Sequence, residues 1–126
     1  MKKVYLSLSA AANSILVSMI IEFLNKHDIE VIRFEKPPYD FKIIDPADIL
    51  MVIPPDGQFD LVRKGSGSEV EYALRKEKKC YIVTFNINFE FHSVTEVVVA
   101  NPGDWKKTYF RLKVEPTTKM FENLFS

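Results

Sequence analysis

Apolar positions in the first part of the chain alternate between short continuous runs and a helical periodicity. Residues 4–8 and 29–34 are short runs rich in β-forming side chains, and each predicts a strand. Between them, residues 11–26 contain neither Gly nor Pro, and apolar side chains recur at spacings of three and four, which predicts an amphipathic helix. Two consecutive prolines in 36–45 predict a loop or an irregular short segment.

The remaining chain continues the alternation of strands and helices. The run "DILMVI" is continuous and apolar, as in parallel strands that are buried on both faces. The turn sequence "NPGD" separates two further strand candidates, so these are expected to form an antiparallel hairpin. A helical stretch is expected to end the chain. The predicted strands are 48–53, 80–85, 94–100 and 108–114, and the predicted helices are 66–78 and 117–125.

This order of elements predicts one α/β domain over residues 1–126, with a parallel core, a C-terminal hairpin and a terminal helix. Ligands of such sheets bind outside the carboxyl ends of the strands. Those ends are predicted at 7–11, 54–57 and 86–89, and the stretch 63–69 lies at the same edge. The candidate site is therefore expected there.

Charge and cysteine content exclude several classes of function. The 17 basic and 17 acidic residues give a formal net charge of zero, which argues against broad nucleic-acid binding. The single Cys80 excludes an internal disulfide framework and a multi-cysteine metal site, and its apolar surroundings predict a buried thiol. His27 and His92 are isolated in the sequence, so we expect no metal site.

The sequence also bears on localisation. Residues 1–3 resemble the basic start of a signal peptide, but Ser7, Ser9 and Asn13 interrupt the apolar region that would have to follow. The apolar stretches fall far short of the roughly 20 residues that span a bilayer. We therefore expect a soluble, cytoplasmic protein with no membrane partner.

The run Gly-Ser-Gly-Ser at 65–68 is a candidate phosphate-binding segment. Glycine permits a concave arrangement of backbone N–H groups, and the positive end of the following helix favours an anion. The pattern matches neither the P-loop nor the dinucleotide-binding spacing, and a flexible loop with solvated charges is an equally good interpretation. The predicted ligand-binding residues of this segment are Arg63, Lys64, Gly65, Ser66, Gly67 and Ser68.

The residues alone leave two interpretations of Glu69 open. Ser66 and Glu69 match the capping-box pattern, in which the glutamate only completes the start of a helix. Alternatively, a carboxylate near a helix N-terminus is favoured by the helix dipole and can act as a nucleophile toward a sugar carbon. Asp56 would then be the second carboxylate, although Pro-Asp-Gly is also ordinary turn chemistry.

Other polar residues follow the carboxyl ends of the first and fourth predicted strands. Asparagine is common at such positions for turn reasons, so a ligand role is one of two interpretations there. Tyr39 and Trp105 can stack on a base, but aromatic side chains are more often part of the core. The further predicted ligand contacts are Ser7, Ser9, Asn86 and Asn88.

Three sequence blocks resemble one known superfamily in order and spacing. "KKVYLSLSA" at 2–10, "DPADILMVIPPDG" at 45–57 and "GSGSEVEYALRKEKKCYIV" at 65–83 look like the nucleoside 2-deoxyribosyltransferases. That superfamily includes nucleoside-5′-phosphate N-glycosidases and small phage and bacterial relatives. The resemblance implies a flavodoxin-like fold, cleavage or transfer at an N-glycosidic bond, no cofactor, and a homo-oligomer whose subunits complete each other's pockets.

The resemblance also assigns roles to three residues. It implies that Glu69 is the nucleophile, that Asp56 assists departure of the base, and that Tyr5 orients the nucleophile. The sequence departs from the family pattern at 9–12, where Ser-Ala-Ala-Ala replaces a Gly- or Pro-containing turn. At Arg63, transferases often carry Asp and phosphate-specific relatives carry Ser. This departure favours a phosphorylated nucleotide over a free nucleoside.

Two functions from other classes fit the same sequence. The protein can be a non-catalytic binder of a nucleotide or a nucleotide-derived signal, with the basic Gly-Ser segment holding the phosphates. A phage-encoded binding protein is included in this alternative. It can also be a degenerate protein-interaction module whose hairpin and terminal helix form the interface. Whether the protein is an enzyme is left open by the residues.

The basic residues before the Gly-Ser run generate a test of nucleotide against nucleoside. A charge-assisted hydrogen bond to phosphate contributes about 1.5–3 kcal/mol, or about 10- to 150-fold in affinity. We expect Arg63→Ala to weaken a nucleoside 5′-monophosphate by that factor and to leave the matching nucleoside unchanged. Calorimetry at two salt concentrations checks this, since the charged contribution fades as salt rises. Equal affinity of the wild-type protein for both ligands would contradict it.

Overall fold

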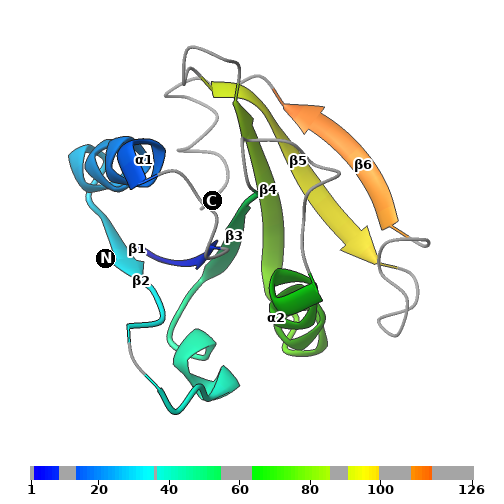
Figure 1. Cartoon of the computed structure of the whole chain (residues 1–126). Helices are drawn as coiled ribbons and strands as arrows, with labels where there is room; N and C mark the ends of the chain where they lie inside the picture. Colours follow the sequence, from blue (N-terminus) through cyan, green and yellow to red (C-terminus); the bar gives the residue numbers. More distant parts are fainter. Residues whose placement is uncertain are drawn as a thin grey trace.

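Six strands of the described residues form one sheet, in the order β2-β1-β3-β4-β5-β6 (Figure 1). The computed structural model describes residues 2–8, 14–35, 37–54, 64–85, 91–99 and 109–114. The first four strands run parallel, β5 is antiparallel to β4, and β6 is antiparallel to β5. The strands are β1 Lys2–Leu8, β2 Ile29–Ile32, β3 Ile49–Ile53, β4 Lys79–Phe85, β5 Phe91–Val99 and β6 Tyr109–Val114.

The order of the parallel strands confirms the predicted fold class, an α/β flavodoxin-like arrangement with a parallel core. The chain passes from β1 to β2 on one side and then returns to place β3 on the other side of β1. Strand order therefore reverses between β1 and β3. In open α/β sheets, ligands bind at the carboxyl edge beside such a reversal.

Among the described residues, one helix packs on each face of the sheet. Helix α1, Ser14–Lys26, packs through its buried Ile20 and Leu24 on the face that carries Val4 and Leu6 of β1. Helix α2, Lys64–Arg75, packs on the opposite face, which carries Tyr5 of β1. The side chains of β1 alternate between the two faces, as in any strand. Figure 1 shows α1 beside β2 and α2 beside β4.

In its described residues, the connection from β2 to β3 contains one short 3₁₀ helix, η1, Phe41–Ile44. Asp40 caps it by accepting a hydrogen bond from the Lys42 N–H at 2.9 Å. Ile44 and Ala47 are buried in the same cluster as Tyr5, so the connection covers the sheet face that α2 covers. The predicted irregular segment is thus confirmed, and it brings residues 37–44 to the α2 side of the sheet.

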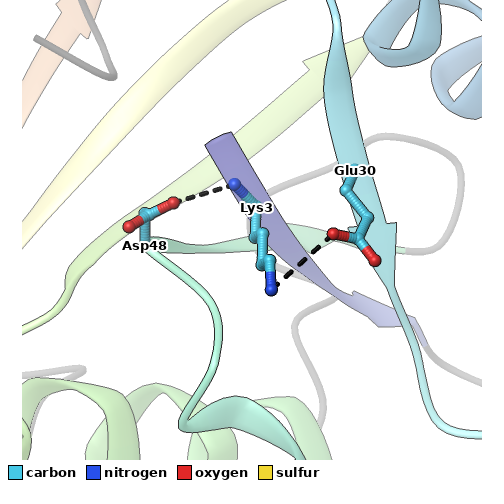
Figure 2. A network of polar contacts seen from close by, with 3 residues as sticks. All are labelled: Lys3, Glu30 and Asp48. Atoms are coloured by element: carbon cyan, nitrogen blue, oxygen red, sulfur yellow. Dashed lines mark hydrogen bonds and ion pairs between the residues drawn. The ribbon is translucent and has the colours of Figure 1, made fainter. Parts of the chain in front are cut away.

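Two hydrogen bonds between Lys3 and Asp48 align β1 with β3, and Figure 2 shows the one to the Asp48 side chain. The Lys3 N–H donates to Asp48 Oδ2 at 2.8 Å, and the Asp48 N–H donates to the Lys3 carbonyl at 2.9 Å. Lys3 Nζ also lies 3.8 Å from Glu30 Oε2, but both side chains are exposed, so this ion pair contributes little. The alignment places Ser7 opposite Val52 near the carboxyl edge.

Helix α2 differs from its predicted bounds of 66–78 at both ends. It ends at Arg75 because Glu77 adopts a left-handed conformation, with φ of 59°. The Glu77 N–H donates to the Leu74 carbonyl at 3.0 Å, and the Lys78 N–H donates to the Ala73 carbonyl at 2.9 Å. These two bonds form a Schellman motif, which satisfies the last carbonyls of the helix.

The second half of the sheet confirms the predicted antiparallel pair. β5 and β6 pair from Val94↔Val114 to Val99↔Tyr109. The turn at 101–104 and the terminal stretch 117–125 lie outside the described residues, and the terminal helix stays a prediction. Within the part of the chain that is described, no helix is long and apolar enough to cross a membrane.

Lys78 generates a test of how the end of α2 is fixed. Its Nζ donates to the carbonyls of Asp45 at 2.9 Å and of Ala47 at 2.6 Å, which joins α2 to the segment that enters β3. We expect Lys78→Met to lower the free energy of unfolding by about 1.5–3 kcal/mol. Lys79 is exposed, and Lys79→Met is the matched control, with an expected change within about 0.5 kcal/mol. Equal effects of the two substitutions in urea denaturation would disprove the role of Lys78.

Candidate functional site

Glu69 lies on α2 with its carboxylate turned toward the sheet and only 9% of the residue exposed. Ser7, on β1, is completely buried, and its Oγ donates a hydrogen bond to Glu69 Oε1 at 2.8 Å. The two residues are 62 positions apart in the sequence. The contact joins α2 to β1, the strand beside which strand order reverses. Glu69 therefore lies at the position where this fold class binds ligands.

The other carboxylate oxygen is held from the β2–β3 connection. Tyr39 precedes η1, and its hydroxyl donates to Glu69 Oε2 at 2.7 Å. Unlike Ser7, Tyr39 is 38% exposed. The carboxylate thus lies between a rigid, buried strand and a partly exposed connection.

Tyr5 is the third hydroxyl group at Glu69. It is 1% exposed, and burial raises the pKa of its phenol far above the ordinary value, with further increases from hydrogen bonds to Glu69 and Tyr39. Burial, followed by the hydrogen bond to Glu69, also raises the pKa of Tyr39. Both phenols are therefore neutral at physiological pH and able to donate hydrogen bonds. Three hydroxyl groups surround one carboxylate.

The capping-box interpretation of Glu69 is wrong. Helix α2 begins at Lys64, so Ser66 lies inside the helix and cannot be its N-cap. The oxygens of Glu69 accept hydrogen bonds from Ser7 and Tyr39, so its described partners are hydroxyl groups on neighbouring elements.

The interpretation of the Gly-Ser run as a loop is also wrong, because its residues form the first turns of α2. The backbone N–H groups available to an anion are therefore those of a helix N-terminus, which normally lack partners within the helix. The buried Gly67 shows that this turn lies close against the rest of the protein. The predicted residues placed in the helix are Lys64, Gly65, Ser66, Gly67 and Ser68.

The structure brings together three of the predicted site residues, Tyr5, Ser7 and Glu69. Ser7 donates a hydrogen bond to Glu69, and its predicted contact with a ligand stays a prediction. The residues Ser9, Asp56, Arg63, Asn86 and Asn88 lie outside the described residues, so their roles stay predictions.

Tyr39 is the site residue whose part the sequence did not predict. The sequence offers base stacking or the core as its role, and the structure shows a hydrogen bond to Glu69 across 30 positions. No periodicity marks Tyr39, because the segment around it is not a regular element. The only signal in the sequence is the density of aromatic residues between 34 and 41.

The described side chains include no group of three or more His, Cys, Asp or Glu residues that could hold a metal ion. Cys80 is buried as predicted. Burial raises the pKa of its thiol to about 12, so the thiolate that would react or bind a metal is not formed near neutral pH.

Comparisons with known proteins add little to this geometry. No family model matches the chain, and no curated protein matches it. One solved structure with a similar arrangement is a heterocyclase in complex with substrate and cofactor, which is 10% identical with a TM-score of 0.44. The similarity covers 98% of this chain but only 18% of that protein.

Tyr5 generates a prediction about alkaline pH. In the unfolded chain its phenol ionises near pH 10.0, whereas in the folded protein it stays neutral to higher pH. The stability that Tyr5 contributes is therefore complete below pH 10 and is lost as the pH rises further. We expect the free energy of unfolding to fall less steeply above pH 10 in Tyr5→Phe than in the wild-type protein. Parallel slopes in urea denaturation would contradict the burial of this phenol.

Proposed function

We propose that this protein cleaves or transfers at the N-glycosidic bond of a nucleotide, with Glu69 as the nucleophile. The observation that carries the proposal is the buried carboxylate of Glu69, held by Ser7 and Tyr39 at the carboxyl edge of the sheet. A nucleophile must be fixed in one orientation relative to the sugar carbon it attacks. Hydrogen bonds to both oxygens supply that orientation.

The energetics of burial support a functional role for Glu69. Burying a charged group is costly unless hydrogen bonds compensate for the lost water. Its helix neighbours Val70 and Ala73 are completely buried in an apolar cluster on the same sheet face. An apolar side chain at 69 would extend that cluster without such compensation. Departures of this kind from simple packing are typical of functional sites.

The proposed reaction proceeds in two steps. An oxygen of Glu69 attacks C1′ of the sugar, and the bond between C1′ and the base nitrogen breaks with its electron pair leaving on the base. An acid protonates the departing base, and we assign this proton to Asp56. Water or a second base then attacks C1′ and releases Glu69, which gives hydrolysis or transfer. Tyr5 and Ser7 stay neutral and keep the carboxylate oriented.

The proposed substrate carries a phosphate. The first turn of α2 supplies the positive end of the helix dipole and the kind of backbone N–H groups that bind anions. Arg63 and Lys64 add two positive charges to this segment of the sequence. A 5′-phosphate at the helix N-terminus would place the sugar of the nucleotide near Glu69, which lies further along the same helix.

A second candidate function is nucleotide binding without turnover. The observation in its favour is that both oxygens of Glu69 already accept hydrogen bonds, which is also what a purely structural link between α2 and β1 requires. In that case the first turn of α2 would still bind the phosphate. Chemistry at Glu69 separates the two functions.

Glu69→Gln tests the nucleophile directly. It keeps the size of the side chain and removes the attacking carboxylate, so we expect base release from a susceptible nucleotide to fall by several orders of magnitude. Glu71→Gln is the matched control, because it removes the same charge from the same helix and should keep wild-type turnover. Base release is measured by chromatography over a panel of ribo- and deoxyribonucleoside 5′-monophosphates.

A covalent intermediate gives a second measurement. A substrate whose sugar carries fluorine at C2′ slows the second step, so the sugar phosphate is expected to remain attached to Glu69 and to appear in the mass of the peptide that contains it. Turnover by Glu69→Gln at the wild-type rate, or attachment to another residue, would refute the nucleophile. Binding without base release for every nucleotide in the panel would establish the second candidate.

A further inference from the structure

Four aromatic rings form a continuous row beside Glu69. Phe34 contacts Tyr39 with ring centroids 5.1 Å apart, Tyr39 contacts Phe41 at 5.1 Å, and Phe41 stacks on Tyr72 of α2 at 5.2 Å. Phe34, Tyr39, Phe41 and Tyr72 are called the aromatic row below. The row extends from the end of β2 across the β2–β3 connection to α2.

Three members of the aromatic row are exposed to an unusual degree for large rings. Phe34 is 41% exposed, Tyr39 38% and Phe41 37%. Exposed apolar groups that are contiguous, unlike those scattered singly, are a common mark of a binding surface. A hollow of about 460 Å³ adjoins the row at Phe34 alone, and Arg33, Pro38 and Asp40 are among the other residues that line it. Its volume lies within the usual range for small-molecule sites.

The aromatic row reaches the candidate nucleophile through Tyr39, whose hydroxyl lies 2.7 Å from Glu69 Oε2. The other two hydroxyl residues at this carboxylate, Ser7 and Tyr5, are almost completely buried, with 0% and 1% exposed. Among the described residues, therefore, the exposed contact of this carboxylate is with the aromatic row. A ligand that reaches Glu69 past these residues comes by way of Tyr39.

The chemistry of an N-glycoside then places the base. In a reactive complex, C1′ lies about 3–3.5 Å from the attacking oxygen, and the base is bonded directly to C1′. The base must therefore lie within a few ångströms of Glu69. Flat aromatic rings stack on nucleobases irrespective of base identity. The exposed rings nearest to Glu69 in the described part of the chain belong to the aromatic row.

We propose that the aromatic row is the base-binding subsite, in which the planar base of the ligand stacks against Phe34 and Phe41 while Glu69 faces its sugar. The identity of the ligand as a nucleotide rests on the proposed function. The aromatic row specifies that the described residues recognise the base of that ligand. Stacking has no hydrogen-bond code, so the subsite accepts different bases.

Binding of nucleotides without turnover tests the subsite. Deoxynucleoside 5′-monophosphates and the base-free deoxyribose 5-phosphate are titrated calorimetrically into the full chain carrying Glu69→Gln, alone and combined with Phe34→Ala or Phe41→Ala. Loss of a stacking ring should weaken the nucleotides by about 5- to 150-fold. Deoxyribose 5-phosphate should bind each protein equally.

Two further variants keep the test decisive. Met19→Ala, on α1 against the other sheet face, is the matched control, because Met19 is 46% exposed and should not alter binding. Phe41→Leu keeps apolar bulk against Tyr72 if the alanine variant does not fold, and it should still weaken nucleotides. Unchanged nucleotide affinity in the row variants would overturn the subsite. A parallel loss of deoxyribose 5-phosphate binding, or no nucleotide binding at millimolar concentration in the Glu69→Gln parent, would overturn it as well.

The outcome separates the subsite from the proposed function. If nucleotide binding depends on the aromatic row but the wild-type protein releases no base, the subsite stands and the glycosidase proposal fails. If the wild-type protein releases base but binding is indifferent to Phe34 and Phe41, the glycosidase proposal stands and the subsite fails.

Discussion

The hydrogen bond between Ser7 and Glu69 is the contact on which the organisation of the site depends. A carboxylate that is nearly buried must replace its lost hydration with donors from the protein, and those donors have to come from elements that the fold brings together. Ser7 supplies one donor from β1, the strand beside which strand order reverses. Tyr39 supplies another from the β2–β3 connection. One buried charge therefore fixes α2, β1 and the connection relative to one another. It does so at the edge where flavodoxin-like sheets bind ligands.

The sequence predicted the sheet well because burial on both faces leaves a clear signal. β3, Ile49–Ile53, is buried throughout, and a continuous apolar run is what a central parallel strand requires. The start of α2 was predicted less well. A Gly-Ser run has low helix propensity, but packing of the helix against the sheet outweighs that preference, as the buried Gly67 illustrates. Helix propensity applies to the Gly-Ser run in isolation, whereas tertiary contacts determine its structure in the folded protein.

The candidate site was predictable only in part, and for a physical reason. Tyr5 and Glu69 were singled out by resemblance to a family, since neither periodicity nor composition distinguishes them. The contact of Ser7 with Glu69 spans 62 positions and depends on the register between strands, which a single sequence does not specify. The contact of Tyr39 with Glu69 depends in addition on the path of an irregular connection. Nothing in local sequence chemistry determines where such a connection places one side chain.

The two oxygens of Glu69 are held in different ways, and this asymmetry links the site to the aromatic row. Oε1 is bound by a completely buried serine on a strand, where a change of partner would require β1 itself to move. Oε2 is bound by a tyrosine that is more than a third exposed and lies outside regular secondary structure. Of these two partners, Tyr39 is the one that lies outside the sheet. Within the proposed mechanism, Oε2 is therefore the oxygen that meets the sugar. Because Tyr39 also packs against Phe34 and Phe41, the rings proposed to stack on the base are in direct contact with the residue that covers Oε2.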